Sequence, residues 1–166
     1  MTAAAGRPDR DASPQAVERF HSEWDRLEAE YLSRLGQACR DLSEWRDRFR
    51  AAAATTVRLA EENPAEARFM VVEALAIGEP GRRRQQALGA RLAACIDSAR
   101  EQHPDPDTVP PVTASWVVSV FFDRIYRRFV NNPGPDLASQ LPELMFIAVS
   151  SYFGTEAGLE ELGVPP

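Results

Sequence analysis

The side chains that most often carry out catalysis are few in this sequence and lie far apart. The two histidines, His21 and His103, have no serine or cysteine nucleophile at a motif spacing, and no glycine-rich loop suited to phosphate occurs. Carboxylates are adjacent at positions 61–62 and 160–161, but neighbouring residues on a helix point in different directions and form no catalytic pair. The sequence therefore predicts a protein that is not an enzyme and that uses no cofactor.

The two cysteines, Cys39 and Cys95, are the next candidates for chemistry. They are far apart in the sequence, and the chain has neither a C-x-x-C pair nor a cluster of histidines. We therefore expect two buried, reduced thiols, with no bound metal and no disulfide.

One ionisable residue, Glu73, stands in the middle of the most apolar stretch of the chain. Burying a lone carboxylate costs several kcal/mol, so Glu73 needs a partner. Two interpretations stay open. Glu73 pairs with an arginine or a backbone donor, or it faces a cavity and binds a polar or cationic group of a ligand.

The stretch that carries Glu73 runs from Asn63 to Gly78 and has the marks of a helix. Asn63 suits the cap, Pro64 suits the first turn, and Gly78 suits a left-handed end. Its apolar residues cover nearly the whole circumference, and they are Phe69, Met70, Val71, Val72, Ala74, Leu75 and Ile77. Because a helix that is apolar all round is a buried one, we expect the other helices to surround it.

Length and composition indicate one soluble globular domain. The chain has 166 residues, of which 44% are apolar and 27% are charged, and no apolar run is long enough to span a bilayer. The first residues lack the apolar core of a secretory signal, so we expect a cytoplasmic protein without a membrane partner. The net charge of −6 argues against a domain that binds DNA through its own surface field.

Periodic apolar residues, separated by breakers, predict an all-α fold. The expected helices are 14–40, a second one from a capping box at Asp41 and Glu44, the central helix, a fourth over about 81–102, a fifth from Thr113, and a sixth ending at Phe153. A proline-rich loop separates the fourth helix from the fifth. Residues 1–12 are expected to be disordered, residues 13–154 to form the domain, and residues 155–166 to form a tail.

Two groups of arginines invite an anion-binding interpretation. Arg46, Arg48 and Arg50 alternate along the second helix, and we interpret them as a solvated face. The run at 82–84 opens the fourth helix, where cations oppose the helix dipole. Either an acidic ligand or partner binds this run, or carboxylates such as Glu79 compensate its charge.

Several of these segments resemble TetR-family transcriptional regulators. The stretch Pro64-Ala-Glu-Ala-Arg-Phe-Met-Val-Val-Glu-Ala-Leu-Ala-Ile-Gly resembles the central P-x-x-A-R-x-x-x-V-E-A-L-x-x-G helix of many members. The segments Phe122-Asp-Arg-Ile-Tyr-Arg-Arg-Phe, Leu141-Pro-Glu-Leu-Met-Phe and Tyr152-Phe-Gly are similar to the last two helices of the family's C-terminal effector domain.

The resemblance implies a six-helix TetR-type C-terminal domain. In that arrangement residues 14–40 match the linking helix, the next three helices surround an effector pocket, and the last two helices form a dimeric four-helix bundle. Family members also carry an N-terminal helix-turn-helix domain that reads DNA, whereas only a short segment precedes the linking helix here. We therefore expect no direct nucleic-acid binding by this chain.

Two sets of site residues follow. An apolar pocket for a small-molecule effector is expected near Phe49, Phe69, Met70, Glu73 and Trp116, the alternative being a solid core. The last two helices have more apolar surface than one core needs, so a dimer interface is expected at Val117, Val120, Phe121, Met145, Ile147 and Val149.

The expected function is that of a TetR-like effector-binding and dimerisation domain without its own DNA-binding domain. Such a chain would sense a small molecule as a homodimer, or would pair with a full-length TetR-like protein and act as an anti-repressor. The alternative is a stand-alone small-molecule-binding helical protein with no role in DNA binding.

Overall fold

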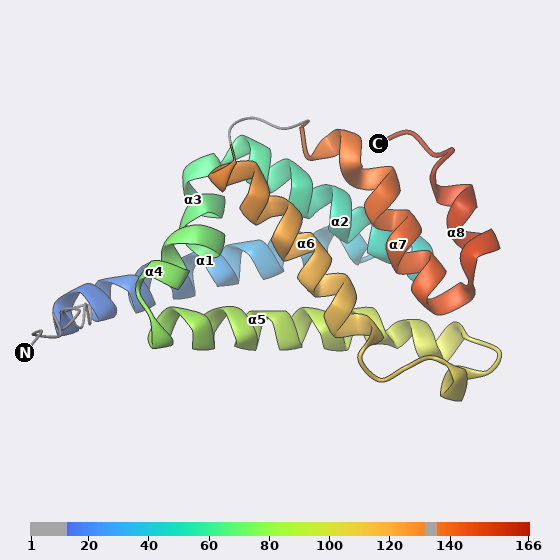
Figure 1. Cartoon of the computed structure of the whole chain (residues 1–166), viewed down its shortest axis with the longest axis horizontal. Coiled ribbons are helices and arrows are strands. Elements are labelled where there is room, and N and C mark those ends of the chain that lie inside the picture. The colour runs from blue at the N-terminus through green and yellow to red at the C-terminus, as the bar shows by residue number, and fades with distance from the viewer. Residues whose placement is uncertain (1–12, 132–135) are drawn as a thin grey trace, which may run out of the picture.

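The fold is all-α in the parts of the chain that the computed structural model describes, which are residues 13–131 and 136–166 (Figure 1). The α-helices are α1 (Pro14–Cys39), α2 (Trp45–Glu62), α3 (Pro64–Arg68), α4 (Ala74–Ala76), α5 (Glu79–Asp97), α6 (Thr113–Val130), α7 (Leu141–Phe153) and α8 (Thr155–Glu161). Shorter helical turns are η1 (Phe69–Glu73), η2 (Ser98–Gln102), η3 (Pro106–Thr108) and η4 (Ala138–Gln140). The all-α prediction is confirmed, whereas its finer assignment to a TetR-type domain with a dimeric bundle stays a prediction.

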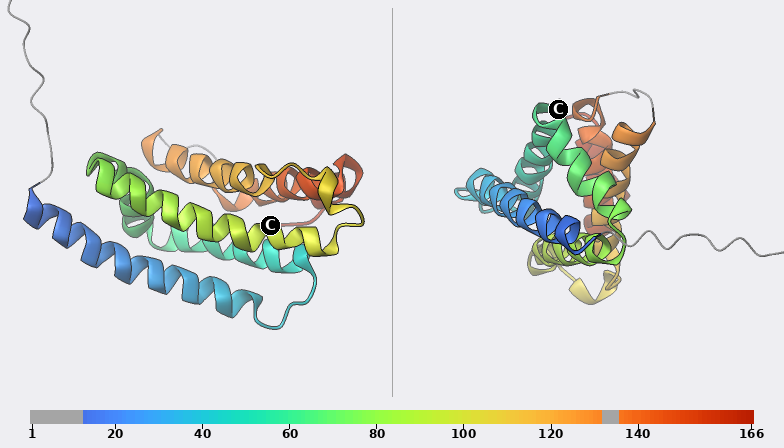
Figure 2. Two further views of the ribbon diagram at one scale, coloured as in Figure 1. Left: turned by 90° about the horizontal axis from the view of Figure 1, so that it is seen from below. Right: turned by 90° about the vertical axis from the view of Figure 1, so that its left-hand side faces the viewer.

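Four long helices give the molecule its elongated shape. Figure 2 shows α1, α2 and α5 extending along the long direction, whereas α6 crosses α5 obliquely in Figure 1. The α6 helix packs on α5 and on the η1 turn. The shorter helices α7 and α8 pack tightly on one another, and α7 also contacts α2 and α6. This arrangement leaves α1, α2, α5 and α6 as the walls of the molecule's interior.

The apolar stripes predicted for α1 and α7 do face the interior. In α1 the buried residues are Phe20, Trp24 and Leu27, at the three- and four-residue steps of one helical face. Ser13 caps this helix, because its side chain accepts a hydrogen bond from the backbone of Ala16 at 3.3 Å. In α7 the buried residues are Leu141, Leu144, Met145, Ala148, Val149 and Tyr152.

The central helix is not buried on all sides, and that prediction is wrong. The helix is interrupted by η1, a π-helical turn in which the Ala74 backbone N–H bonds to the Phe69 carbonyl, five residues back. A π turn inserts one extra residue, so the apolar side chains after it rotate relative to a regular helix. Only Val71 and Ala74 are buried, and Leu75 is exposed.

The C-terminal segment was expected to be a tail, but residues 155–161 form α8. Gly154, with a φ of 86°, turns the chain back after α7. The helix is held to α2 by Glu161, whose buried carboxylate binds Arg46 at 2.6 Å and also binds Arg50. The prediction that these arginines form a solvated face is therefore wrong for Arg46 and Arg50.

The start of α2 also differs from the expected capping box. Glu44 stands at the cap position, but no side chain caps the helix from there. The backbone N–H of Trp45 donates instead to the Gln102 side chain at 3.0 Å, from the far end of η2. A residue remote in sequence thus satisfies the free donor at this helix end.

Candidate functional site

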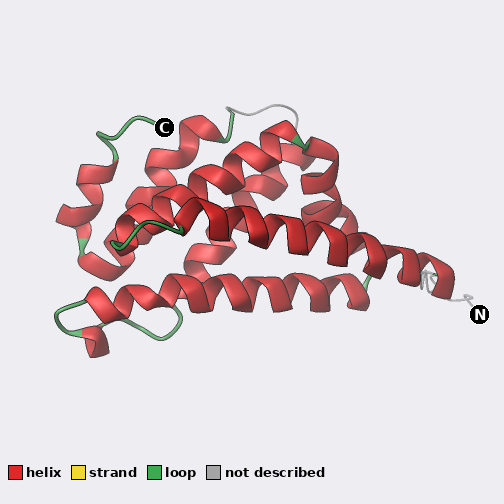
Figure 3. Cartoon of the chain, turned by 180° about the vertical axis from the view of Figure 1, so that it is seen from behind, coloured by secondary structure: helices red, strands yellow, loops and turns green. Residues whose placement is uncertain are grey.

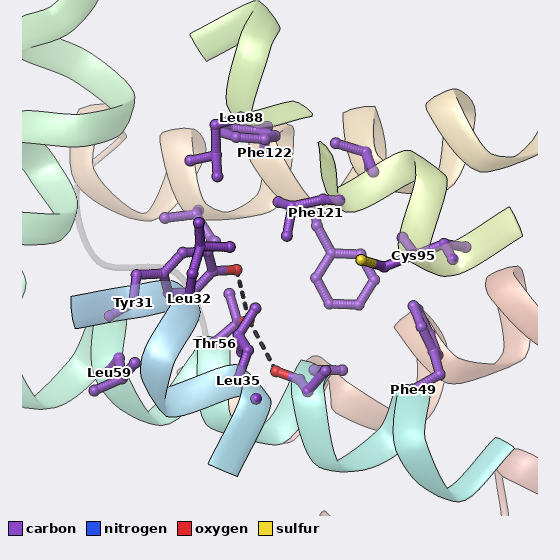
Figure 4. A pocket seen from close by; sticks show the side chains of 18 of the residues that line it. Tyr31, Leu32, Leu35, Phe49, Thr56, Leu59, Leu88, Cys95, Phe121 and Phe122 are labelled. Carbon is purple, nitrogen blue, oxygen red and sulfur yellow. Dashed lines mark hydrogen bonds between the residues drawn. The ribbon is translucent and has the colours of Figure 1, made fainter. Parts of the chain in front are cut away.

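An apolar cavity of about 590 Å³ lies between α1, α2, α5 and α6, with α3 and η1 at one end. This volume is within the range of small-molecule sites, which are typically roughly 300–1,000 Å³. Figure 4 shows the side chains that point into it, among them Leu32, Phe49, Leu88, Phe121 and Phe122. The apolar faces of these four helices therefore surround a cavity and do not pack directly against one another at this place.

The cavity lies beside the C-terminal half of α1. Closer to the start of α1, two ion pairs join it to α5, Asp25 with Arg84 at 2.8 Å and Glu28 with Arg91 at 2.6 Å. In Figure 3, α1 crosses in front and α5 runs below it. Beyond the ion pairs, Gly36 from α1 and Cys95 from α5 are exposed and border the cavity, so this is where it opens.

One polar pair lies on the apolar wall. The Tyr31 hydroxyl is 2.9 Å from the Thr56 hydroxyl, which in turn donates to the Ala52 carbonyl at 2.8 Å (Figure 4). Burial raises the pKa of the Tyr31 hydroxyl. Tyr31 is therefore a neutral phenol near physiological pH.

The charged residues that border the cavity are mostly acidic. They are Glu30, Glu66, Glu101 and Arg48. Arg26 pairs with Glu30 at 3.6 Å and with Glu66 at 3.0 Å, which neutralises part of the acidic charge. The wall thus offers a ligand very little positive charge.

The two cysteines are free, and both border the cavity. The Cys39 thiol donates to the Arg48 carbonyl at 3.3 Å, and burial raises its pKa. Cys95 is exposed, so the expectation that both thiols are buried is wrong for it. Cys95 points toward Phe121 from α5, at the open side of the cavity (Figure 4).

Two of the five residues predicted near a pocket do line the cavity, Phe49 and Met70. Phe69 instead packs against Phe20, with ring centroids 5.4 Å apart. Trp116 is 70% exposed on α6 and lies outside the cavity lining. Tyr31 and Thr56 were not predicted to line a pocket, although their hydroxyl groups within otherwise apolar helical stripes were a signal for it.

Glu73 does not reach the cavity either. It is exposed, and its carboxylate lies 3.6 Å from the Arg68 guanidinium. The structural interpretation, in which Glu73 pairs with an arginine, therefore describes it, and the ligand-facing interpretation does not. The reason is the η1 turn, which leaves Glu73 on the solvent side of the central helix.

The residues predicted at a dimer interface fall into two groups. Val117, Met145 and Val149 are buried inside the single chain, so the monomer core already uses them. Phe121 lines the cavity and packs against the same core. Val120 and Ile147 are half-buried and keep some surface.

The remaining candidates for chemistry have partners within the chain. His21 accepts a hydrogen bond from Arg84 at 3.1 Å, and His103 accepts one from the Asp105 backbone at 2.9 Å. Glu79 binds Arg82 and Arg83 at 3.1 and 2.7 Å, so carboxylates do compensate the arginine run. Within the described residues, no group of histidine, cysteine or acidic side chains could hold a metal ion.

Comparisons with known proteins leave the cavity as the main guide to function. No protein-family model, curated protein or solved structure matches this chain. Among the helices of residues 13–131 and 136–166, none has the length and apolar character needed to cross a membrane. What the chain does must therefore be inferred from its own residues.

Proposed function

We propose that this chain is a small-molecule-binding effector domain of the TetR type, which binds an apolar ligand in the cavity between α1, α2, α5 and α6. The observation that carries the proposal is the cavity itself. Its lining is mostly aliphatic and aromatic, with a hydroxyl pair on the wall and a few charged residues at its border, as in small-molecule sites generally. The sequence resemblance to TetR effector domains supports the same function.

The position of the cavity also suits a sensor. Its walls come from helices that are far apart in the sequence, so a ligand contacting all of them would bias their relative packing. The α1 helix is joined to α5 by ion pairs near one end and borders the open cavity at the other. Ligand binding would therefore act on the angle between α1 and α5.

The test is to block the cavity from within. Ala52 lines the cavity from α2, and the Ala52→Trp substitution would place an indole in it. A thermal-shift screen with apolar compounds should raise the melting temperature of the wild type but not that of the variant. Ala94→Trp, at an exposed position on α5, is the matched control and should respond as the wild type does. Equal responses of all three proteins would contradict the proposal.

Pairing with a second chain is the other part of the proposed function, and one observation favours it. Trp116 on α6 is 70% exposed, and Val112, the N-cap residue one helical turn before it, is 47% exposed. Large apolar side chains exposed next to each other mark interaction surfaces. We place the contact on this outer face of α6, with Val120 beside it, rather than on the residues that the core uses.

The partner is a second copy of the chain or a full-length TetR-like protein. In the second case the mixed dimer would have one DNA-reading head, and a two-fold operator needs two. Capture of a TetR-like protein from the cytoplasm by the tagged chain would support this anti-repressor role. Recovery of the chain alone, with a ligand-dependent rise in melting temperature, would favour the stand-alone binder.

A further inference from the structure

We infer that the cavity selects uncharged apolar molecules carrying a hydrogen-bond donor, such as an alcohol, a phenol or an amide N–H, and discriminates against carboxylates. This inference rests on the proposed function, because it specifies the ligand class of the same cavity. Its basis is the direction of the hydrogen bonds on the wall, together with the charges around it.

The donor in the Tyr31–Thr56 pair can be assigned. A hydroxyl has one proton to donate and two acceptor positions. The Thr56 hydroxyl donates its proton to the Ala52 carbonyl at 2.8 Å, so it can only accept from Tyr31. The Tyr31 hydroxyl therefore donates to Thr56, and both protons of the pair are used inside the protein.

The Tyr31–Thr56 pair therefore offers a ligand only hydrogen-bond acceptors. No hydrogen bond from another described residue reaches the Tyr31 hydroxyl oxygen, so its two acceptor positions are open. A ligand hydroxyl or N–H can donate to this oxygen without breaking either internal bond. A ligand that has only acceptor atoms, such as an ether or an ester, finds no free proton at the hydroxyl pair, so its oxygen stays unpaired when it lies there.

The charges around the cavity disfavour an anionic head group. Among the described residues, three carboxylates and one guanidinium, that of Arg48, belong to its lining. Arg48 is eight positions from Thr56 along α2, roughly 12 Å at the rise of an α-helix. A carboxylate beside the hydroxyl pair would therefore be desolvated with no cation near it, which is unfavourable. A ligand carboxylate that paired with Arg48 would lie too far from the hydroxyl pair to bind both.

The ligands for the test differ only in the head group. Decanol and methyl nonyl ether are isomers with the same atoms, so they differ in whether the oxygen carries a proton. Decanoate has a chain of the same length with an anionic head. Affinities are measured by displacement of a fluorescent apolar probe from the wild-type protein, below the micelle concentration of each compound.

We expect decanol to bind about three- to tenfold more tightly than methyl nonyl ether, the effect of one hydrogen bond. Decanoate is expected to be the weakest of the three. Tyr31→Phe removes the acceptor, so it should weaken decanol binding to the level of the ether and leave the affinity for the ether unchanged. Tyr126→Phe removes a hydroxyl outside the cavity lining and should keep the preference. Circular dichroism and melting curves confirm that the variants are folded.

Each outcome separates this inference from the proposed function. If the alcohol and the ether bind equally, or if Tyr31→Phe keeps the preference, the assigned hydrogen-bond direction does not select the ligand, but the cavity still binds. If decanoate binds most tightly and Arg48→Gln removes that affinity, the cavity selects anionic ligands through Arg48, and our inference is wrong. If none of the three compounds displaces the probe, the proposed function itself fails.

Discussion

At residue 81 the absence of a side chain decides how closely two helices meet. A Cβ atom added to Gly81 would overlap the carbonyl group of Ala74, so the start of α5 packs directly on the backbone of α4. Gly36, in the C-terminal half of α1, is the opposite case, since a Cβ there would meet nothing. The two glycines form a matched pair for asking what a methyl group costs.

We expect Gly81→Ala to destabilise the protein by about 1–3 kcal/mol, because the backbone must move to admit the methyl group. Gly36→Ala should stabilise it by about 0.5–1 kcal/mol, because alanine restricts the unfolded chain and favours the helix. Urea denaturation of both variants measures these changes. A stable Gly81→Ala protein would show that α4 and α5 are not packed as described.

Two tyrosines, the half-buried Tyr31 and the buried Tyr152, make stability depend on alkaline pH. Burial raises the pKa of Tyr31 and that of Tyr152, and for Tyr152 the hydrogen bond that its hydroxyl donates to Asp97 raises it further. Their ordinary pKa is 10.0, so the unfolded chain loses these protons first as pH rises. The stabilising contribution of the neutral phenols is full below that value and is lost above it.

The free energy of unfolding should therefore fall as pH rises above about 10. The double variant Tyr31→Phe, Tyr152→Phe should lose less stability over the same interval, because phenylalanine does not titrate. Urea denaturation between about pH 8 and about pH 11 measures both curves. Parallel curves would indicate that other groups cause the alkaline loss.

Among the elements, α8 depends on its packing against α7 and on ion pairs with α2 more than on its own sequence. It is short, and isolated helices of this length are not stable in water. Its last residue, Glu161, is 4% exposed and binds Arg46 and Arg50 of α2, while Glu160 binds Arg46 at 3.0 Å. The helix is thus held by partners from the other end of the chain.

Neutralising this carboxylate should release the helix. We expect Glu161→Gln to cost about 1–3 kcal/mol, because it leaves two partly buried guanidinium groups without their main counter-charge. Hydrogen exchange of the α8 backbone should accelerate more than that of α7. Glu156→Gln, at an exposed position in the same helix, is the control. Equal exchange rates in the two variants would show that the Glu161 carboxylate does not stabilise α8.

For the whole molecule, we propose that the exposed surface at the start of α6 is where two chains associate. Trp116 and Val112 are exposed there, whereas Leu159 is an exposed apolar residue on α8. Tryptophan is enriched among the residues that dominate binding energy at interfaces. A dimer through α6 would cover Trp116 and leave Leu159 in solvent.

We expect Trp116→Ala to weaken dimerisation by about 2 kcal/mol or more, roughly thirtyfold in dissociation constant. Leu159→Ala should leave it unchanged. Light scattering after size-exclusion chromatography over a dilution series gives both constants. If Leu159→Ala gave monomers and Trp116→Ala left the dimer unchanged, the interface would lie on α8 and not on α6.

The sequence by itself determined where most helices begin and end and which faces of α1 and α7 are buried. These features depend on nearby residues: the three- and four-residue steps of the apolar stripes, the Ser13 cap, and glycines at positions 78 and 154 whose φ values are positive. Such short-range signals can be read without knowing what packs against them.

Only the tertiary structure decided what each polar side chain contacts. Glu161 meets Arg46 across 115 residues of chain, and Tyr31 meets Thr56 across 25. Neither pairing leaves a periodic signal, because it depends on how whole helices are placed. The same reason explains Glu73, which a single π turn keeps out of the interior. Whether apolar faces meet or enclose a cavity depends on the distances between helices, and these arise only when the chain has folded.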